Sequence, residues 1–155
     1  MDKAVAYQQL KEEIASVVAG ETSETARYAS AACLMALVFR PRFFWTGFYL
    51  VDPLKPLELV VGPYQGTLGC LRIPFGKGVC GHVAATREPI IVPDVHAFPG
   101  HIACDSASNS EIVVPVFKAD GGLAGVLDVD STEYDAFDQV DQAGLVDICR
   151  ILLTA

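Results

Sequence analysis

Two apolar segments separated by a Gly-Gly turn limit the folds that are open to this chain. Residues 111–117 and 123–130 each have the length and the β-branched composition of a buried strand. Asp120-Gly121-Gly122 lies between them, and such a sequence favours a hairpin because glycine accepts the positive φ angles of tight turns. The two segments are therefore predicted to pair as antiparallel strands.

Helices are predicted at both ends of the chain. Apolar residues recur at helical spacing over residues 3–19, then over a segment that begins after Thr22 or Ser23 and ends at Pro41, and again over about 138–153. The segments between them are short, and we expect the following order: strands 43–51 and 57–61, a turn at 63–66, an extended piece at 70–73, a brief helix at 79–87 and a strand at 90–92.

These elements predict a fold of the α/β class, more narrowly α+β. We expect one mostly antiparallel sheet with helices packed on one face and a loop-rich side opposite. With 155 residues and no linker or repeat, the chain is predicted to form a single domain over residues 1–155.

Composition excludes several classes of function. The net charge of −8 argues against nucleic acid as a partner, because phosphates need a basic surface. No apolar run reaches membrane-spanning length. The segment Met1–Val5 lacks the layout of a signal peptide, so a cytoplasmic location is expected.

Five cysteines are many for a protein of a reducing compartment, and an odd number does not suggest a secreted disulfide framework. Cys33 and Cys149 lie within predicted helices and are interpreted as packing residues. Cys70, Cys80 and Cys104 lie in the loop-rich middle of the chain, where metal binding, catalysis or redox chemistry is the natural interpretation.

Cys104 has the most suggestive surroundings. It lies within residues 99–111, a run of small and polar side chains between a Pro-Gly turn and the strand that starts at Glu111. Such loops have few packing duties and often carry reactive groups on a rigid scaffold. The alternative is that Cys104 is a small buried hydrophobic residue, which is a common fate of cysteine.

The sequence does not favour three other kinds of site. Residues 76–81 match G-x-G-x-x-G, but the prolines at 74 and 89 leave no room for the strand and long helix of a dinucleotide site. The serines near His101 include no nucleophile elbow. Zinc donors are present without a C-x-x-C pair, so we expect no metal and no cofactor; the donors are His82, His96, His101, Cys80 and Cys104.

Acidic and aromatic side chains predict a pocket instead. Asp128 and Asp130 alternate on one strand and so point to the same face of the sheet, and Glu111 begins the neighbouring strand. Trp45 and Tyr49 also share a face, although such pairs are often core residues. Together these side chains suit a small molecule that has an apolar part and an amine.

Longer motifs make the sequence resemble a known family. From about Phe44 to Leu145 the chain is similar to the free methionine-(R)-sulfoxide reductases, which are single GAF domains. The matching segments are Trp45-x-x-x-Tyr49, Gly62–Gly66, Cys70–Gly81, Asp94–His96, Phe98–Glu111 and Gly125–Ser131.

The resemblance implies an enzyme of oxidative-stress defence with three redox-active cysteines. The cysteine at position 104 would attack the sulfoxide sulfur, release methionine and become a sulfenic acid. Cys70 would condense with it to a disulfide, which thioredoxin reduces, and Cys80 would have an auxiliary or alternative part. The resemblance also implies that Glu111, Asp128 and Asp130 bind the substrate amine and help to protonate its oxygen, and that Trp45 and Tyr49 enclose the apolar end.

Some alternatives stay open. Carboxylates beside Cys104 should disfavour its thiolate, unless the same crowding keeps an acid protonated and able to donate a proton. A non-enzymatic GAF domain that senses a small ligand is the main alternative function, and a structural thiol protein is a third. The sequence does not decide whether Cys70 or Cys80 resolves first, nor whether the first two helices pack against a second copy in a homodimer.

Overall fold

The computed structural model describes residues 2–102 and 104–154. Its elements, in chain order, are α1 (Lys3–Val18), α2 (Glu24–Phe39), β1 (Trp45–Asp52), β2 (Lys55–Gln65), β3 (Arg72–Pro74), α3 (Gly78–Thr86), β4 (Ile90–Val92), the 3-10 turn η1 (Val95–Ala97), β5 (Ser110–Phe117), β6 (Leu123–Ser131) and α4 (Gln139–Thr154).

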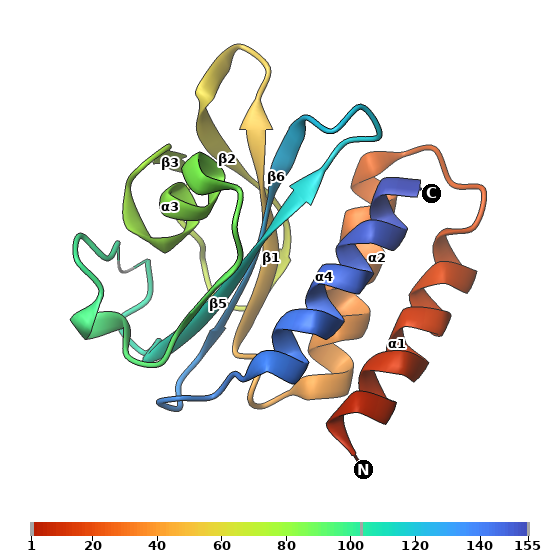
Figure 1. Ribbon diagram of the computed structural model, residues 1–155, viewed down its shortest axis with the longest axis horizontal. Helices are drawn as coiled ribbons and strands as arrows, with labels where there is room; N and C mark the ends of the chain where they lie inside the picture. The colour runs from red at the N-terminus through yellow and green to blue at the C-terminus, as the bar shows by residue number, and fades with distance from the viewer. Residues whose placement is uncertain (1, 103, 155) are drawn as a thin grey trace.

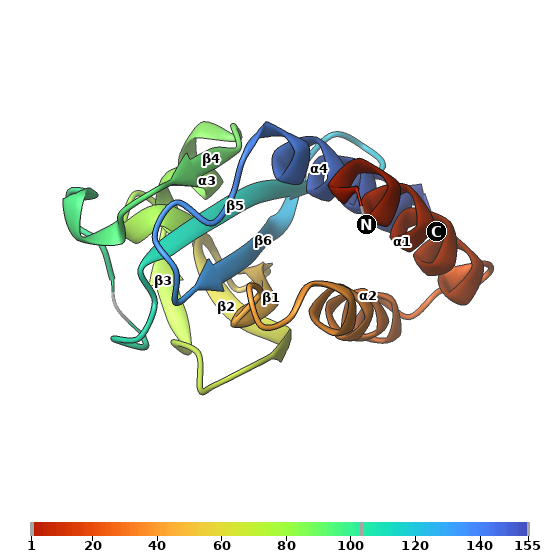
Figure 2. The same ribbon diagram turned by 90° about the horizontal axis from the view of Figure 1, so that it is seen from below.

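The strands form one antiparallel sheet in the order β3-β2-β1-β6-β5-β4 (Figure 1). Helices α2 and α4 pack on one face of it, and α1 packs across these two helices (Figure 2). Helix α3 and the loops around it lie on the other face. This arrangement confirms the predicted α+β fold, with the loop-rich side opposite the three long helices.

Local sequence accounts for where the helices begin and end. The Asp2 carboxylate accepts a hydrogen bond from the amide of Ala4 at 2.8 Å, and the Ser23 hydroxyl accepts one from Ala26 at 3.2 Å, so each caps a helix start. Helix α3 ends at Thr86, and the next residue, Arg87, adopts the left-handed conformation with φ 61°.

Two apolar clusters lie on the two faces of the sheet. The larger joins the sheet to α1, α2 and α4; its fully buried members include Leu10, Ile14, Met35, Phe48, Leu127, Leu145 and Ile148. The smaller lies under α3 and contains Trp45 and Tyr49. Cys149 belongs to the larger cluster and is buried, whereas Cys33 is half-buried. The packing role predicted for Cys149 is confirmed, and that of Cys33 stays a prediction.

A buried carboxylate ties the helical layer together. Asp141 on α4 is fully buried and accepts hydrogen bonds from the Tyr7 hydroxyl at 2.7 Å, from Lys3 at 2.9 Å and from Arg42 at 3.1 Å. Breaking such a network would leave an uncompensated charge in the interior. None of the helices among the described residues is long and apolar enough to cross a membrane.

The predicted turn at residues 63–66 is wrong for most of its length. Strand β2 continues to Gln65, opposite Thr46 of β1, and only Gly66 leaves the strand. The pairing with β1 shifts register between Val61 and Tyr64, which places Pro63 in a bulge. Pro63 also lies beyond the part of β2 that pairs with β3, so its missing N–H interrupts no bond there.

Candidate active site

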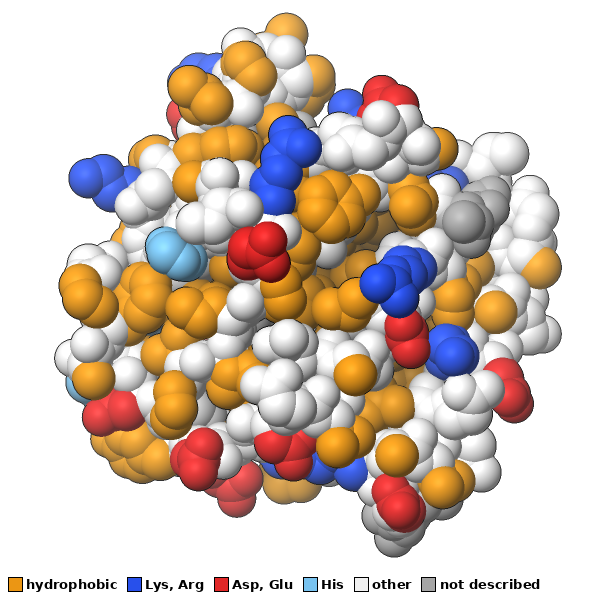
Figure 3. Space-filling model, viewed as in Figure 1, with side chains coloured by type: hydrophobic (Ala, Val, Ile, Leu, Met, Phe, Trp, Pro, Cys, Tyr) orange, Lys and Arg blue, Asp and Glu red, His pale blue; other side chains and the backbone are white. Residues whose placement is uncertain are grey.

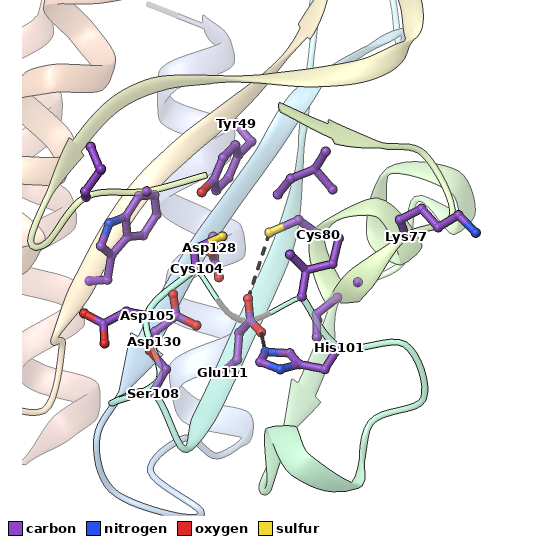
Figure 4. A pocket seen from close by; sticks show the side chains of 17 residues that line it. Tyr49, Lys77, Cys80, His101, Cys104, Asp105, Ser108, Glu111, Asp128 and Asp130 are labelled. Atoms are coloured by element: carbon purple, nitrogen blue, oxygen red, sulfur yellow. Dashed lines mark hydrogen bonds and ion pairs between the residues drawn. The ribbon is translucent and has the colours of Figure 1, made fainter. Parts of the chain in front are cut away.

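One small cavity gathers the predicted site residues on the α3 side of the sheet (Figure 4). Its volume is about 40 Å³. Seven of the eight residues line it, namely Trp45, Tyr49, Cys80, Cys104, Glu111, Asp128 and Asp130. The eighth, Cys70, is not among the seventeen lining residues, but a disulfide bond joins it to Cys104, which is. Residues far apart in the chain therefore meet at one place.

A larger apolar groove lies elsewhere. It has a volume of about 450 Å³ and runs between the end of α3 and α4, with Pro115 and Phe117 of β5 in its lining. The hollow with a hydrophobic floor at the centre of Figure 3 corresponds to this region. It contains none of the predicted site residues, so the smaller cavity is the candidate site.

A disulfide joins Cys70 to Cys104, and Cys104 lines the cavity. The two Cα atoms are 5.3 Å apart, although 34 positions separate the residues in the chain. Cys104 is exposed and Cys70 is half-buried. The loops that carry Cys70 and Cys104 are also joined by a hydrogen bond, which the Thr67 hydroxyl donates to the Asp105 carboxylate at 2.7 Å. Because Cys104 is exposed, the disulfide bond is accessible from solvent.

Three carboxyl groups form the floor of the cavity. Glu111 of β5 faces Asp130 of β6 across the antiparallel pair. Asp128 precedes Asp130 by two positions on β6 and points to the same side of the sheet. Asp128 and Glu111 are each 5% exposed. Oδ1 of Asp128 is buried and has no hydrogen-bond partner among the residues that the structure describes. The floor therefore has unsatisfied capacity to accept hydrogen bonds.

Burial disfavours the ionised form of these three acids. It raises the pKa of Glu111 and of Asp130 well above the ordinary range, and the negative charge of Asp128 raises both further. Burial also raises the pKa of Asp128. The raised pKa values favour the protonated carboxyl form, which can donate a proton and does not repel a nearby thiolate.

Cys80 lies deeper than the disulfide. The first turn of α3 carries it, and its thiol donates a hydrogen bond to Oε2 of Glu111 at 3.9 Å (Figure 4). Burial raises its pKa well above that of a free thiol, and the charges of Asp128 and Glu111 raise it further. Cys80 is therefore held as a neutral thiol beside the acids and not in the disulfide.

Aromatic rings form the apolar wall. Trp45 and Tyr49 project from one face of β1 with their ring centroids 5.5 Å apart, and Tyr64 stacks on Trp45 at 5.0 Å. The Trp45 indole N–H donates to the carbonyl of Thr67 at 2.8 Å. A Cβ at Gly69 would lie 2.9 Å from the Trp45 ring and 3.1 Å from the Tyr49 hydroxyl, so only glycine lets this loop lie against both rings.

His101 lines the same cavity, and it is not among the eight predicted site residues. Its Nε2 lies 3.7 Å from Oε1 of Glu111, so Glu111 lies between His101 and Cys80 (Figure 4). Burial lowers the pKa of this imidazole, which favours its neutral form. Its position in the loop just before Cys104 is a signal that could have identified it.

Known proteins with similar sequences show the family of this chain. The GAF domain family model matches residues 11–155. A protein of Escherichia coli described as a free methionine-R-sulfoxide reductase is 43% identical over 145 residues, which cover 94% of this chain and 85% of that protein.

Two solved structures are also similar to the chain. The free methionine-R-sulfoxide reductase of Neisseria meningitidis, solved in complex with its substrate, has a TM-score of 0.94 and 47% identity, covering 99% of this chain and 90% of that one. A putative GAF sensor protein from Burkholderia vietnamiensis has a TM-score of 0.92 and 48% identity, covering 99% and 94%.

Proposed function

We infer the reaction of this chain from the family to which the chain belongs. It is a member of the GAF domain family and, within that family, of the free methionine-R-sulfoxide reductases. It is an oxidoreductase that acts on a sulfur group. The proposed reaction is reduction of free L-methionine-(R)-sulfoxide to methionine. The observation that carries it is the Cys70–Cys104 disulfide over a floor of buried acids.

Cys104 is the proposed nucleophile. Its sulfur attacks the sulfoxide sulfur, takes up the oxygen as a sulfenic acid, and methionine leaves in reduced form. The thiol of Cys70 then displaces water from the sulfenic acid and forms the disulfide. Two observations support this assignment: Cys104 is exposed and lines the cavity, and Cys80, the other thiol nearby, is buried and held neutral.

The acids have two proposed tasks. A protonated carboxyl group in the cluster donates to the sulfoxide oxygen as its bond to sulfur breaks. An ionised partner in the same cluster accepts hydrogen bonds from the substrate ammonium group, and the unpartnered Oδ1 of Asp128 supports this role. Trp45 and Tyr49 would enclose the methyl and methylene groups.

The disulfide must be reopened after every turnover. We propose that a dithiol protein of the thioredoxin type does this: one of its thiolates attacks the disulfide, and its second thiol releases both cysteines in reduced form. The exposure of Cys104 supports access by such a partner. A cytoplasmic location is part of the proposal, because that compartment keeps dithiol reductants in supply.

A homodimer is a separate part of the proposal. Several apolar side chains of α1 and α2 are exposed, among them Val17 and Leu37, each 55% exposed. Packing of this surface against a second copy would cover them. Sedimentation equilibrium of the chain and of a Val17→Lys, Leu37→Lys variant tests this point, which the reaction itself does not need.

A turnover assay tests the reaction. The reduced protein is mixed with free L-methionine-(R)-sulfoxide and dithiothreitol, and the methionine formed is measured. We expect many turnovers for each protein molecule, and the S epimer should react far more slowly. Binding of the amino acid without turnover would contradict the proposal and would favour the alternative of a ligand sensor.

A further inference from the structure

Three donor atoms of different chemistry meet at the bottom of the cavity. The Cys80 sulfur, one carboxyl oxygen of Glu111 and one of Asp128 all lie within 4.8 Å of one another. All three side chains are buried, with exposed fractions of 4%, 5% and 5%. They come from α3, β5 and β6, so the fold itself, and not a flexible loop, brings them together.

This cluster is more than a group of acids. Oδ1 of Asp128 is a buried acceptor without a hydrogen-bond partner among the described residues, although such atoms are normally satisfied. Cys80 is a free thiol even when Cys70 and Cys104 are joined. When the Cys70–Cys104 disulfide is formed, the cluster therefore still offers two metal ligands: the soft sulfur of Cys80 and the hard, unpartnered Oδ1 of Asp128.

We propose that Cys80, Glu111 and Asp128 form a binding site for a thiophilic divalent cation such as Zn²⁺. Sulfur and carboxylate oxygen are both common zinc ligands, and three protein ligands leave a fourth tetrahedral position for water. His101 lies 3.7 Å from Glu111 and would orient that carboxylate from the second shell of the metal. The cation replaces the protons of the cluster, which are released to solvent on binding.

The size of the cavity favours a small cation. About 40 Å³ holds an ion with a bound water, whereas small-molecule pockets are usually about 300–1,000 Å³ in volume. A metal ion at this site would occupy the acids to which the proposed function assigns the substrate amine. It would therefore inhibit the enzyme, although the site itself needs no turnover and can be tested in the oxidised protein.

The test uses the full chain with its Cys70–Cys104 disulfide formed, because neither of these cysteines can then bind metal. Zn²⁺ is titrated by calorimetry, and Co²⁺ is titrated by absorption, since a thiolate ligand gives a charge-transfer band in the near ultraviolet. Cys80→Ser and Asp128→Asn are the test variants. Cys33→Ser is the matched control, because this half-buried thiol lies on α2, on the other face of the sheet.

The proposal requires one equivalent of Zn²⁺, a thiolate band with Co²⁺, and at least tenfold weaker Zn²⁺ binding in both test variants but not in the control. Circular dichroism shows whether each variant is folded, and either test variant alone suffices if the other does not fold. Equal affinity in a folded test variant and the unchanged protein, or no binding at micromolar Zn²⁺, would overturn it. Failure of the reductase assay with Zn²⁺ binding intact would instead remove the proposed function and leave the metal site.

Discussion

Glu111 and Asp130 face each other across the β5–β6 pair, and both side chains point into the same buried cavity. Two carboxylates directly opposite one another in a sheet repel and would destabilise the pair if both were ionised. Burial raises the pKa of both carboxyl groups, and the negative charge of the neighbouring Asp128 raises both further, so the protonated forms are favoured where charges would conflict. The sheet register therefore places two carboxyl groups that favour their protonated forms side by side at the candidate site.

The first prediction tests the acids as a coupled set. Asp128→Asn and Asp130→Asn should each lower kcat/KM for free methionine sulfoxide by roughly 100-fold, the scale of losing a general acid. The double variant should lose much less than the product of the two effects, because the groups share protons. Steady-state kinetics measure all three, and Asp120→Asn in the exposed hairpin turn is the control. Near-normal turnover in both single variants would contradict the role of the acids.

The second prediction concerns the dependence of stability on pH. The pKa values of Glu111, Asp128 and Asp130 are higher in the folded protein than the value of about 4 in an unfolded chain. The folded state therefore binds more protons above pH 4, and these groups lower the free energy of unfolding as pH rises from there towards their raised pKa values.

Replacing one acid isolates this contribution. Asp130→Asn cannot titrate, so its stability should decrease less between pH 5 and pH 8 than that of the unchanged protein. Urea unfolding of the disulfide-bonded proteins at the two pH values gives the comparison, again with Asp120→Asn as the control. Parallel decreases in Asp130→Asn and the unchanged protein would show that Asp130 has no raised pKa.

The elements around the site were largely predictable from local patterns. The alternation of Asp128 and Asp130, followed by Glu111 on the paired strand, places the acids together by the two-residue period of a strand, and the structure has this arrangement. The turn predicted at residues 63–66 failed, because Gly-Pro-Tyr-Gln-Gly has the composition of a turn while pairing with β1 keeps Pro63 and Tyr64 in β2.

Other features depended on contacts that no local pattern encodes. The sequence left open whether Cys70 or Cys80 pairs with Cys104, since both lie in loop-rich sequence. In the structure, α3 holds Cys80 beside the acids, while the loop before β3 brings Cys70 to Cys104. The position of His101 beside Glu111 likewise depends on how the loop before β5 folds back, which spacing alone does not determine.

The third prediction tests the nucleophile. Cys104→Ser should reduce turnover of free methionine sulfoxide to background, because a serine hydroxyl without a base is a poor nucleophile. Its exposed position should tolerate the change, so thermal unfolding of the reduced proteins should be similar. Cys33→Ser is the control and should retain full activity. Substantial activity in folded Cys104→Ser would rule out Cys104 as the attacking group.

The fourth prediction concerns the substrate amine. N-acetylation removes its charge and its hydrogen bonds to the acids, and leaves buried carboxyl groups unpaired. We expect N-acetyl-methionine sulfoxide and peptide-bound methionine sulfoxide to react at least 100-fold more slowly than the free amino acid. Assays with dithiothreitol as reductant measure this ratio directly. Comparable rates for free and blocked substrates would show that the acids do not bind the amine.

The fifth prediction links the disulfide to substrate binding. With Cys70 and Cys104 joined, and Thr67 bonded to Asp105, the loops before β3 and before β5 leave a cavity of only about 40 Å³. That is several times less than the volume of ordinary small-molecule pockets, so the oxidised protein should not hold the amino acid. Reduction should separate the loops and open the pocket.

Calorimetry with free methionine sulfoxide can measure this effect without turnover. Cys104→Ser lacks both the nucleophile and the disulfide, so it should bind the amino acid at least tenfold more tightly than the oxidised unchanged protein does. Cys104→Ser, Thr67→Val also lacks the hydrogen bond to Asp105, and it should bind at least as tightly as Cys104→Ser because that contact helps to close the pocket. Equal affinity in the oxidised protein and Cys104→Ser would mean that substrate enters beside an intact disulfide. The loops would then have no part in timing substrate entry, and reduction by the dithiol partner would serve only to regenerate the thiols.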